Sequence, residues 1–177
     1  WFGSEAGVSS YDGKSFRNFK IKEVSSPIMA NSFHVSIYEQ KLPENHWMHN
    51  DVNAIIEDKE GRFWFGTRGY ASVYDGKTFT AITKEDGKTF AKGRSIIKDN
   101  KGTIWLGGRD GLWRYDGSTS TNFGKKFVGF IYDDRERNIW TSSESAHDKS
   151  WALSRYDQKS LSTKTPTVTE IATKPMF

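Results

Sequence analysis

The sequence predicts an all-β protein built from short repeats, and three observations lead to this prediction. The tripeptide Tyr-Asp-Gly recurs, a tryptophan stands 10 residues before each of its three copies, and an aspartate stands 6 residues before each later tryptophan. Aromatic residues make up 15% of the 177 residues, although more than a quarter of the chain is charged. Many aromatics in a polar chain favour short, half-buried strands over disorder.

The repeat is defined by residues that keep their mutual spacing. Successive tyrosines lie 63, 41 and 41 residues apart, and in the fourth copy Gln158 stands where the other copies have glycine. The repeated positions are Tyr11, Tyr74, Tyr115 and Tyr156; Trp1, Trp64, Trp105 and Trp140; and Asp58, Asp99 and Asp134. A fixed period of about 40 residues indicates an array of similar supersecondary units.

Each segment of the unit has a physical interpretation. Residues 55–57 are rich in β-branched side chains, and Asp58-Lys59-Glu60-Gly61 predicts a tight turn in which Asp accepts backbone hydrogen bonds and Gly takes a positive φ. Residues 63–66 are apolar on both faces, as in a fully buried strand. Asp-Gly at 75–76 is a hairpin signal, followed by a last strand at 78–82. The unit is therefore a four-stranded antiparallel meander, which is the blade of a β-propeller.

The repeats organise residues 1–177 as a single propeller array of about four blades, partial or open. Arg137 replaces the turn glycine of the fourth blade, which predicts a different turn geometry there. The alternation of Phe33, Val35 and Ile37 allows an extra strand within the insertion. The expected segments are a partial first blade at 1–20, an insertion at 21–50, a second blade at 51–90, a third at 91–123, a degenerate fourth at 124–164 and a spare strand at 165–177.

Residues 55–67 followed by Val73-Tyr74-Asp75-Gly76 resemble the two-component regulator propeller repeat, and residues 96–117 match it as well or better. The resemblance implies a bacterial sensor propeller that lies in the periplasm or outside the cell. It also implies a link to two-component signalling and a carbohydrate or other polar small ligand. We expect no cofactor and no enzymatic activity. Two other functions are open: a protein-interaction scaffold, and a propeller lyase or glycosidase.

Composition excludes several classes of protein. The net charge of +4 comes from cations interspersed with acids, which predicts a solvated surface and no nucleic-acid partner. No apolar run approaches the roughly 20 residues that span a bilayer, so we expect no membrane insertion by this segment. The absence of cysteine excludes disulfides, thiol catalysis and cysteine-ligated metal.

Candidate ligand-binding residues follow the repeated tryptophan. If the blades are pseudo-symmetric, the residues four positions after each tryptophan ring one face near the channel, where arginine and glutamate could bind a carboxylate or sugar hydroxyls. Aromatic side chains beside these loops could stack on a sugar. The candidates are Glu5, Arg68, Arg109 and Glu144, with Tyr70 and Trp151 as stacking residues.

The alternative functions depend on other residues. Glu5 and Glu144 suit a glycosidase only if their carboxyl groups lie about 5–10 Å apart. His46 and His49 are weak metal candidates, because their spacing suits one helical turn but fixes no third ligand. We therefore expect no metal and no cofactor.

Closure of the propeller has three possible forms. Residues 160–163 align with the last strand of the second blade and are expected to end the fourth blade, which leaves residues 167–172 spare. The spare strand could complete the first blade, the insertion strand could do so, or the spare strand could begin a further blade. We favour a fragment of a larger propeller with one open blade edge, through which copies of the chain could associate.

The tryptophan positions are expected to be core. We predict that Trp105→Ala lowers the free energy of unfolding by roughly 3–5 kcal/mol, as is typical when a large buried aromatic is removed. Denaturant titration measures this change, and a loss below about 1 kcal/mol would place Trp105 at the periphery.

Overall fold

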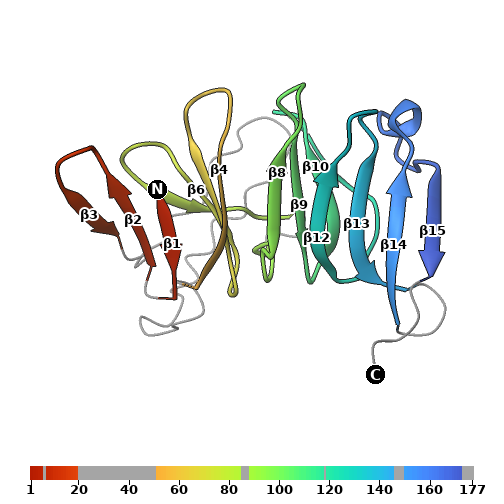
Figure 1. Cartoon of the computed structure of the whole chain (residues 1–177), viewed down its shortest axis with the longest axis horizontal. Coiled ribbons are helices and arrows are strands. Elements are labelled where there is room, and N and C mark those ends of the chain that lie inside the picture. Colours follow the sequence, from red (N-terminus) through yellow and green to blue (C-terminus); the bar gives the residue numbers. More distant parts are fainter. Residues whose placement is uncertain (6, 20–50, 85–87, 118, 146–149, 173–177) are drawn as a thin grey trace.

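The computed structural model describes residues 1–5, 7–19, 51–84, 88–117, 119–145 and 150–172. Their strands form four separate antiparallel sheets that stand side by side in chain order (Figure 1). The expectation of an all-β chain of propeller blades is confirmed. Within the described ranges, no helix combines the length and the apolar character that crossing a bilayer requires.

The first sheet has three strands and each of the others has four. Each later sheet is a meander, with the tryptophan strand second. The first sheet contains β1 (Phe2–Ser4), β2 (Gly7–Tyr11) and β3 (Phe16–Phe19); the second contains β4 (Val52–Glu57), β5 (Phe63–Thr67), β6 (Ala71–Tyr74) and β7 (Phe79–Ala81); the third contains β8 (Ser95–Lys98), β9 (Ile104–Gly108), β10 (Gly111–Tyr115) and β11 (Ser120–Asn122); the fourth contains β12 (Val128–Asp133), β13 (Ile139–Glu144), β14 (Trp151–Tyr156) and β15 (Val168–Ala172).

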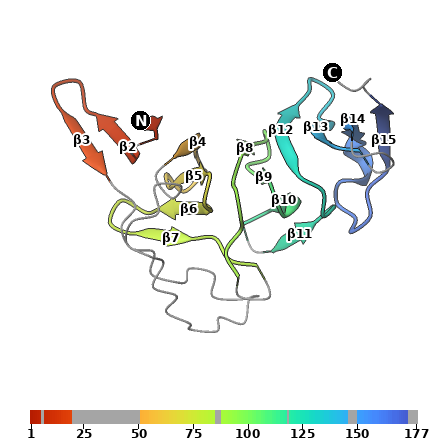
Figure 2. The same cartoon turned by 90° about the horizontal axis from the view of Figure 1, so that it is seen from below.

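The four sheets radiate like a fan. Seen from below, the first strands β4, β8 and β12 lie close together at the inner side, and β7, β11 and β15 lie at the outer side (Figure 2). β4 contacts β8, β8 contacts β12, and β1 contacts β4. Each sheet therefore packs a face on its neighbours, as blades of a propeller do.

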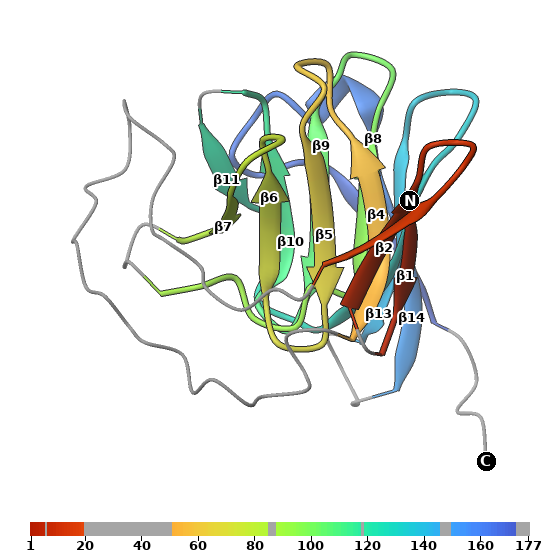
Figure 3. The same ribbon diagram turned by 90° about the vertical axis from the view of Figure 1, so that its left-hand side faces the viewer.

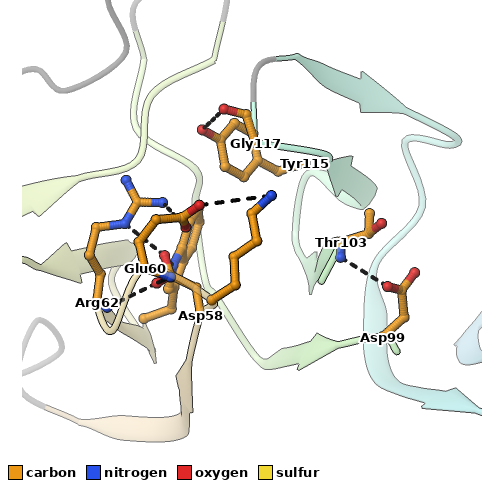
Figure 4. Close-up of polar contacts among 9 residues, drawn as sticks. Asp58, Glu60, Arg62, Asp99, Thr103, Tyr115 and Gly117 are labelled. Atoms are coloured by element: carbon orange, nitrogen blue, oxygen red, sulfur yellow. Dashed lines mark hydrogen bonds and ion pairs between the residues drawn. The ribbon is translucent and has the colours of Figure 1, made fainter. Parts of the chain in front are cut away.

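An aspartate organises the first hairpin of each later blade. In the second blade, Asp58 Oδ1 accepts the backbone N–H groups of Glu60 and Arg62 at 3.0 and 2.9 Å (Figure 4). Asp58 Oδ2 accepts the indole N–H of Trp64 at 2.8 Å. The same indole bond joins Trp105 to Asp99 at 3.0 Å and Trp140 to Asp134 at 2.7 Å. The six-residue spacing seen in the sequence thus reflects one carboxylate that binds both the turn and the tryptophan.

The tryptophans build the core between blades. The Trp1 ring centroid lies 5.8 Å from that of Tyr74, and the Trp64 centroid lies 5.4 Å from that of Tyr115. Trp105 shares a buried cluster with Tyr156. Trp1 and Trp64 therefore pack on the motif tyrosine of the next blade, and Trp105 lies in the same buried cluster as the tyrosine of its next blade.

Gly66, in the second strand of its blade, allows close packing between blades. A Cβ atom at Gly66 would lie 2.6 Å from the backbone carbonyl oxygen of Gly93 in the segment that enters the third blade. Because real Cβ atoms do not approach a carbonyl so closely, any side chain here would push the blades apart.

The turn of the fourth blade keeps the geometry of the others, so the expectation of a different turn was wrong. Gly61 and Gly102 have φ values of 77° and 82°, and Arg137 has 69°. The Arg137 N–H donates to the Asp134 carbonyl at 3.0 Å, as the Gly102 N–H does to that of Asp99. We call the aspartate of each later blade, with its hydrogen bonds to the turn and to the tryptophan, the aspartate clamp. In the fourth blade the clamp of Asp134 imposes the left-handed conformation on a non-glycine residue.

The last strand of the fourth blade was also predicted wrongly. In the first three copies the Tyr-Asp-Gly glycine has a φ of 96–100°, and the tyrosine hydroxyl donates to its carbonyl. Gln158 lacks the freedom of glycine, and Asp157 instead caps a short 3₁₀ helix, η2 (Gln158–Ser160). The fourth strand of this sheet is therefore β15, which lies beyond η2 and pairs with β14.

Residues 168–172 are therefore not spare. β15 completes the fourth sheet, so it neither closes the first blade nor begins another. Among described residues, no strand pairs with β1 on the side away from β2. The insertion strand expected at 33–37 lies outside the described residues.

Arg137→Gly is predicted to stabilise the protein by about 0.5–1 kcal/mol, because the left-handed strain removed exceeds the extra backbone entropy of glycine. The ion pair from Arg137 to Asp133, at 3.6 Å and exposed on the arginine side, contributes little. Chemical denaturation measures the change. The matched control is Gly102→Ala, which should destabilise by about 1–2 kcal/mol, and destabilisation by both variants would contradict the strain argument.

The clamp also alters acid–base equilibria. Burial raises the pKa of Asp58, but the hydrogen bonds from Trp64 and Arg62 outweigh burial, and the pKa lies below its ordinary value. In Asp134 burial is likewise outweighed, by the bonds from Trp140 and Asn138, so its pKa is lowered. Burial raises the pKa of the neighbouring Asp133 above its ordinary value.

These directions predict a loss of stability in acid. A carboxyl group whose folded pKa is lowered contributes stability that is complete above its unfolded pKa, near 3.9, and is lost as the pH falls through the folded pKa. Asp133 acts in the opposite direction. The stability difference between the parent chain and Asp58→Asn, measured by denaturation at pH 7 and at pH 3, should therefore be larger at pH 7. An equal difference at both pH values would contradict a pKa effect of the clamp.

Candidate functional site

Three of the residues expected to form a ring lie at the same end of their sheets. Arg68 and Arg109 directly follow the second strands of their blades, and Glu144 is the last residue of the second strand of its blade. Each of the three donates its backbone N–H to a carbonyl in the segment that leads into the first strand. The bonds are Arg68 to the Asp51 carbonyl at 2.9 Å, Arg109 to that of Ala91 at 3.2 Å and Glu144 to that of Phe127 at 3.0 Å. Glu5 lies in the turn after β1 and is exposed.

A pocket of about 490 Å³ opens at this end of the sheets. Two of the predicted site residues, Arg68 and Trp151, line it together. Its lining comes from the second, third and fourth blades: Thr67, Arg68, Lys92, Arg94, Phe127, Gly129, Ser142 and Trp151. The lining therefore combines three cationic side chains, two hydroxyls and two aromatic rings.

Arg68 is oriented by an acidic neighbour. Its Nε lies 2.6 Å from Oδ2 of Asp51, whose side chain is nearly buried. The pair fixes one edge of the guanidinium group at the rim of the pocket. Guanidinium groups bind planar anions through paired N–H donors, so a held arginine is suited to a carboxylate.

Lys92 and Arg94 were not identified as candidates from the sequence. Lys92 has a φ of 51°, in the left-handed region, and its backbone N–H donates to the Gly69 carbonyl at 3.1 Å. Arg94 Nη1 donates to Asn53 Oδ1 at 3.3 Å. Non-glycine residues held in this region often occur at binding sites. The only sequence signal was Lys-Gly-Arg at 92–94 between two expected strands.

Trp151 and Phe127 form the aromatic side of the pocket. Their rings meet edge to face, with centroids 5.8 Å apart and an interplanar angle of 83°. Gly129 is the extra residue of a bulge in β12, and a Cβ there would lie 3.1 Å from Cη2 of Trp151. The bulge and the missing side chain therefore leave room for the exposed indole.

The other predicted site residues lie elsewhere. Tyr70 is buried against Ala81 and Phe79, and burial raises the pKa of its hydroxyl, so its prediction as a stacking residue was wrong. Arg109, Glu144 and Glu5 are exposed but do not line the pocket. Glu144 is the cross-strand partner of Trp151.

The weak metal candidates, His46 and His49, lie outside the described residues. Within the part of the chain that the structure describes, no group of three His, Asp or Glu side chains is arranged to hold a metal ion.

Comparison with known proteins agrees with this architecture. The profile of the two component regulator propeller family matches residues 46–69. The extracellular domain of the hybrid two component system BT3049 from B. thetaiotaomicron is similar over 95% of this chain, with 20% identity and a TM-score of 0.56. The extracellular domain of the one component system BT4673 from the same organism covers 81% of this chain, with 15% identity and a TM-score of 0.37. No curated protein matches the chain.

This chain spans about a fifth of the first of these structures (21%) and about a quarter of the second (24%). At 20% identity, the likeness to the first supports the shared fold. The repeated aspartate, tryptophan and Tyr-Asp-Gly positions, the profile match over residues 46–69 and this likeness agree in resembling the two component regulator propeller repeat.

Proposed function

We propose that this chain is the ligand-binding part of an extracytoplasmic sensor linked to two-component signalling, and that its pocket receives a carbohydrate or other polar small ligand with an acidic group. The observation that carries the proposal is the pocket lined by Arg68, Lys92 and Arg94 opposite Trp151 and Phe127. Cations attract a carboxylate or sulfate, and an exposed indole offers a face to a sugar ring.

The size and origin of the pocket support the same proposal. A volume of about 490 Å³ lies within the range of small-molecule sites. Three blades contribute to it, so a ligand would bridge elements far apart in the chain. Binding there would favour one arrangement of the blades over others, which is what a sensor needs.

Extracytoplasmic location is supported by the likeness to an extracellular domain of a bacterial signalling system. Binding rather than glycoside hydrolysis is supported by the pocket lining, which among described residues contains no carboxylate. Glycosidases generally use two carboxyl groups that flank the scissile bond.

The test compares an oligosaccharide of uronic acids with a neutral oligosaccharide of equal length. Calorimetric titration should show binding of the acidic ligand and much weaker binding of the neutral one, and added salt should weaken the acidic ligand further. A thermal shift should accompany binding, because a ligand of the native state raises its melting temperature.

Substitutions then locate the site. Arg94→Ala should weaken binding about 10- to 100-fold, as expected when one charge-assisted hydrogen bond is lost. Trp151→Ala should weaken binding of both acidic and neutral sugars. The matched control is Arg109→Ala, since Arg109 is exposed at the same end but outside the pocket. Equal losses for Arg94→Ala and Arg109→Ala would contradict this site.

A further inference from the structure

The connection between the second and third blades carries two of the three cationic side chains of the pocket. Seen from the first sheet, the second sheet stands in front of the third, and β7 and β11 lie on the same outer side (Figure 3). The chain that leaves β7 therefore crosses to the inner side before it begins β8 (Figure 2). Its last residues include Lys92 and Arg94, which line the pocket. The path of this connection thus determines where both cations lie.

The end of the connection is enclosed by backbone of both blades. A Cβ atom at Gly108, the last residue of β9, would collide with the carbonyl oxygen of Lys92. On the side of the second blade, a Cβ atom at Gly66 would lie 2.6 Å from the carbonyl oxygen of Gly93. The main chain at 92–93 therefore passes between two strands that carry no side chain at the points of contact, which leaves it little room to shift.

A single carboxylate joins the connection to the third blade. Asp110 lies in the hairpin between β9 and β10, and its Oδ2 accepts the backbone N–H of Ala91 at 2.8 Å. The same oxygen lies 3.1 Å from Nζ of Lys84. Lys84 comes soon after β7 and Ala91 comes shortly before β8, so one atom of Asp110 binds both parts of the connection.

Asp110 is itself held within the third blade. Its backbone carbonyl accepts the indole N–H of Trp113 at 3.0 Å and the side-chain N–H of Asn122 at 3.1 Å. The residue before it, Arg109, donates its backbone N–H to the carbonyl of Ala91. The carboxylate therefore has a defined position from which to hold the connection.

The residue after Ala91 needs such support. Lys92 has a φ of 51°, and a non-glycine residue in the left-handed region relaxes unless its surroundings hold it there. Its own N–H donates to the carbonyl of Gly69 in the second blade. The bond from Ala91 to Asp110 fixes the preceding peptide on the third blade, so Lys92 is held from both blades.

We propose that Asp110 is a positioning residue for the pocket, through its hydrogen bond with Ala91. It does not line the pocket. Its carboxylate keeps the connection in the path that brings Lys92 and Arg94 to the opening, and Lys84 offsets its charge. The effect on ligand affinity rests on the proposed function, whereas the effect on the connection does not.

Ligand affinity tests the consequence for binding, by calorimetric titration with the uronic acid oligosaccharide and the neutral oligosaccharide of equal length. Asp110→Ala should weaken binding of the acidic ligand about 3- to 10-fold, as expected for the loss of one backbone hydrogen bond, and leave the neutral ligand unchanged. Asp110→Asn keeps an oxygen that can accept the Ala91 N–H and should retain most of the affinity.

The sign of the change separates positioning from simple charge. Removing a negative charge near three cations would, by Coulomb attraction alone, strengthen binding of an acidic ligand in both variants. The matched control is Asp75→Ala, because Asp75 also accepts backbone N–H groups, from Lys77 and Thr78, but in the hairpin at the opposite end of the second blade. The control should leave both affinities unchanged. Stronger acidic binding, or equal losses for both ligands, overturns the proposal.

Amide hydrogen exchange of the free chain, measured by NMR, tests the hold on the connection without any ligand. Asp110→Ala should speed exchange of the Ala91 and Lys92 amides about 10-fold, with Asp110→Asn closer to the parent chain. Exchange in β9 should stay slow, which shows that the fold is intact. Unchanged exchange at Ala91 and Lys92 in Asp110→Ala overturns the proposal. Faster exchange in a chain that binds neither sugar would support the hold by Asp110 and contradict the proposed function alone.

Discussion

A single carboxylate with two kinds of partner controls this structure. In each later blade an aspartate accepts backbone N–H groups of its own turn and the indole N–H of a tryptophan six residues on. The first bond determines where the first strand reverses. The second holds a large ring on one side of the sheet, where the next blade can pack on it. A local turn is thereby coupled to contacts between blades that are distant in sequence.

The pocket depends on the same coupling. Its residues lie at the ends of strands, and the register of the meander determines which side chains reach the opening. Bulges in β4 and β12 occur at equivalent positions, at Asn53 and Gly129. Asn53 accepts a hydrogen bond from Arg94, and Gly129 leaves room for Trp151. The scaffold is thus regular in its turns and irregular where side chains meet the pocket.

The blades could be predicted from sequence because the repeated residues carry their structural role in their own chemistry. Asp with Gly makes the turn, and a bulky aromatic needs burial. The turn at Arg137 was misjudged because the clamp, and not the glycine, determines the conformation. The last strand of the fourth blade was misplaced because it was located by its distance from the repeated tyrosine. The strand that pairs with β14 is β15, which lies further along the chain.

Site prediction was weaker for a physical reason. Pseudo-symmetry predicted that Glu5, Arg68, Arg109 and Glu144 ring one face. Arg68, Arg109 and Glu144 lie at equivalent strand ends, and of these three Arg68 lines the pocket. Lys92 and Arg94 come from a connection between blades that carries no repeat signal, and Tyr70 is drawn into the core by Phe79. Which loop residues converge depends on packing between blades, and spacing along one chain does not contain that information.

The fan arrangement also determines which parts of the molecule unfold locally most easily. Among the described residues, the main contacts of each sheet are with its neighbours, so stability is approximately a sum of blade terms and interface terms along one dimension. In this part of the chain the middle sheets have two such interfaces, whereas the first sheet has one such interface and three strands. Backbone amides of β1–β3 should therefore exchange with solvent through small local openings, and those of β5 and β9 only through larger ones. A single melting temperature would average over these steps and conceal the gradient along the array.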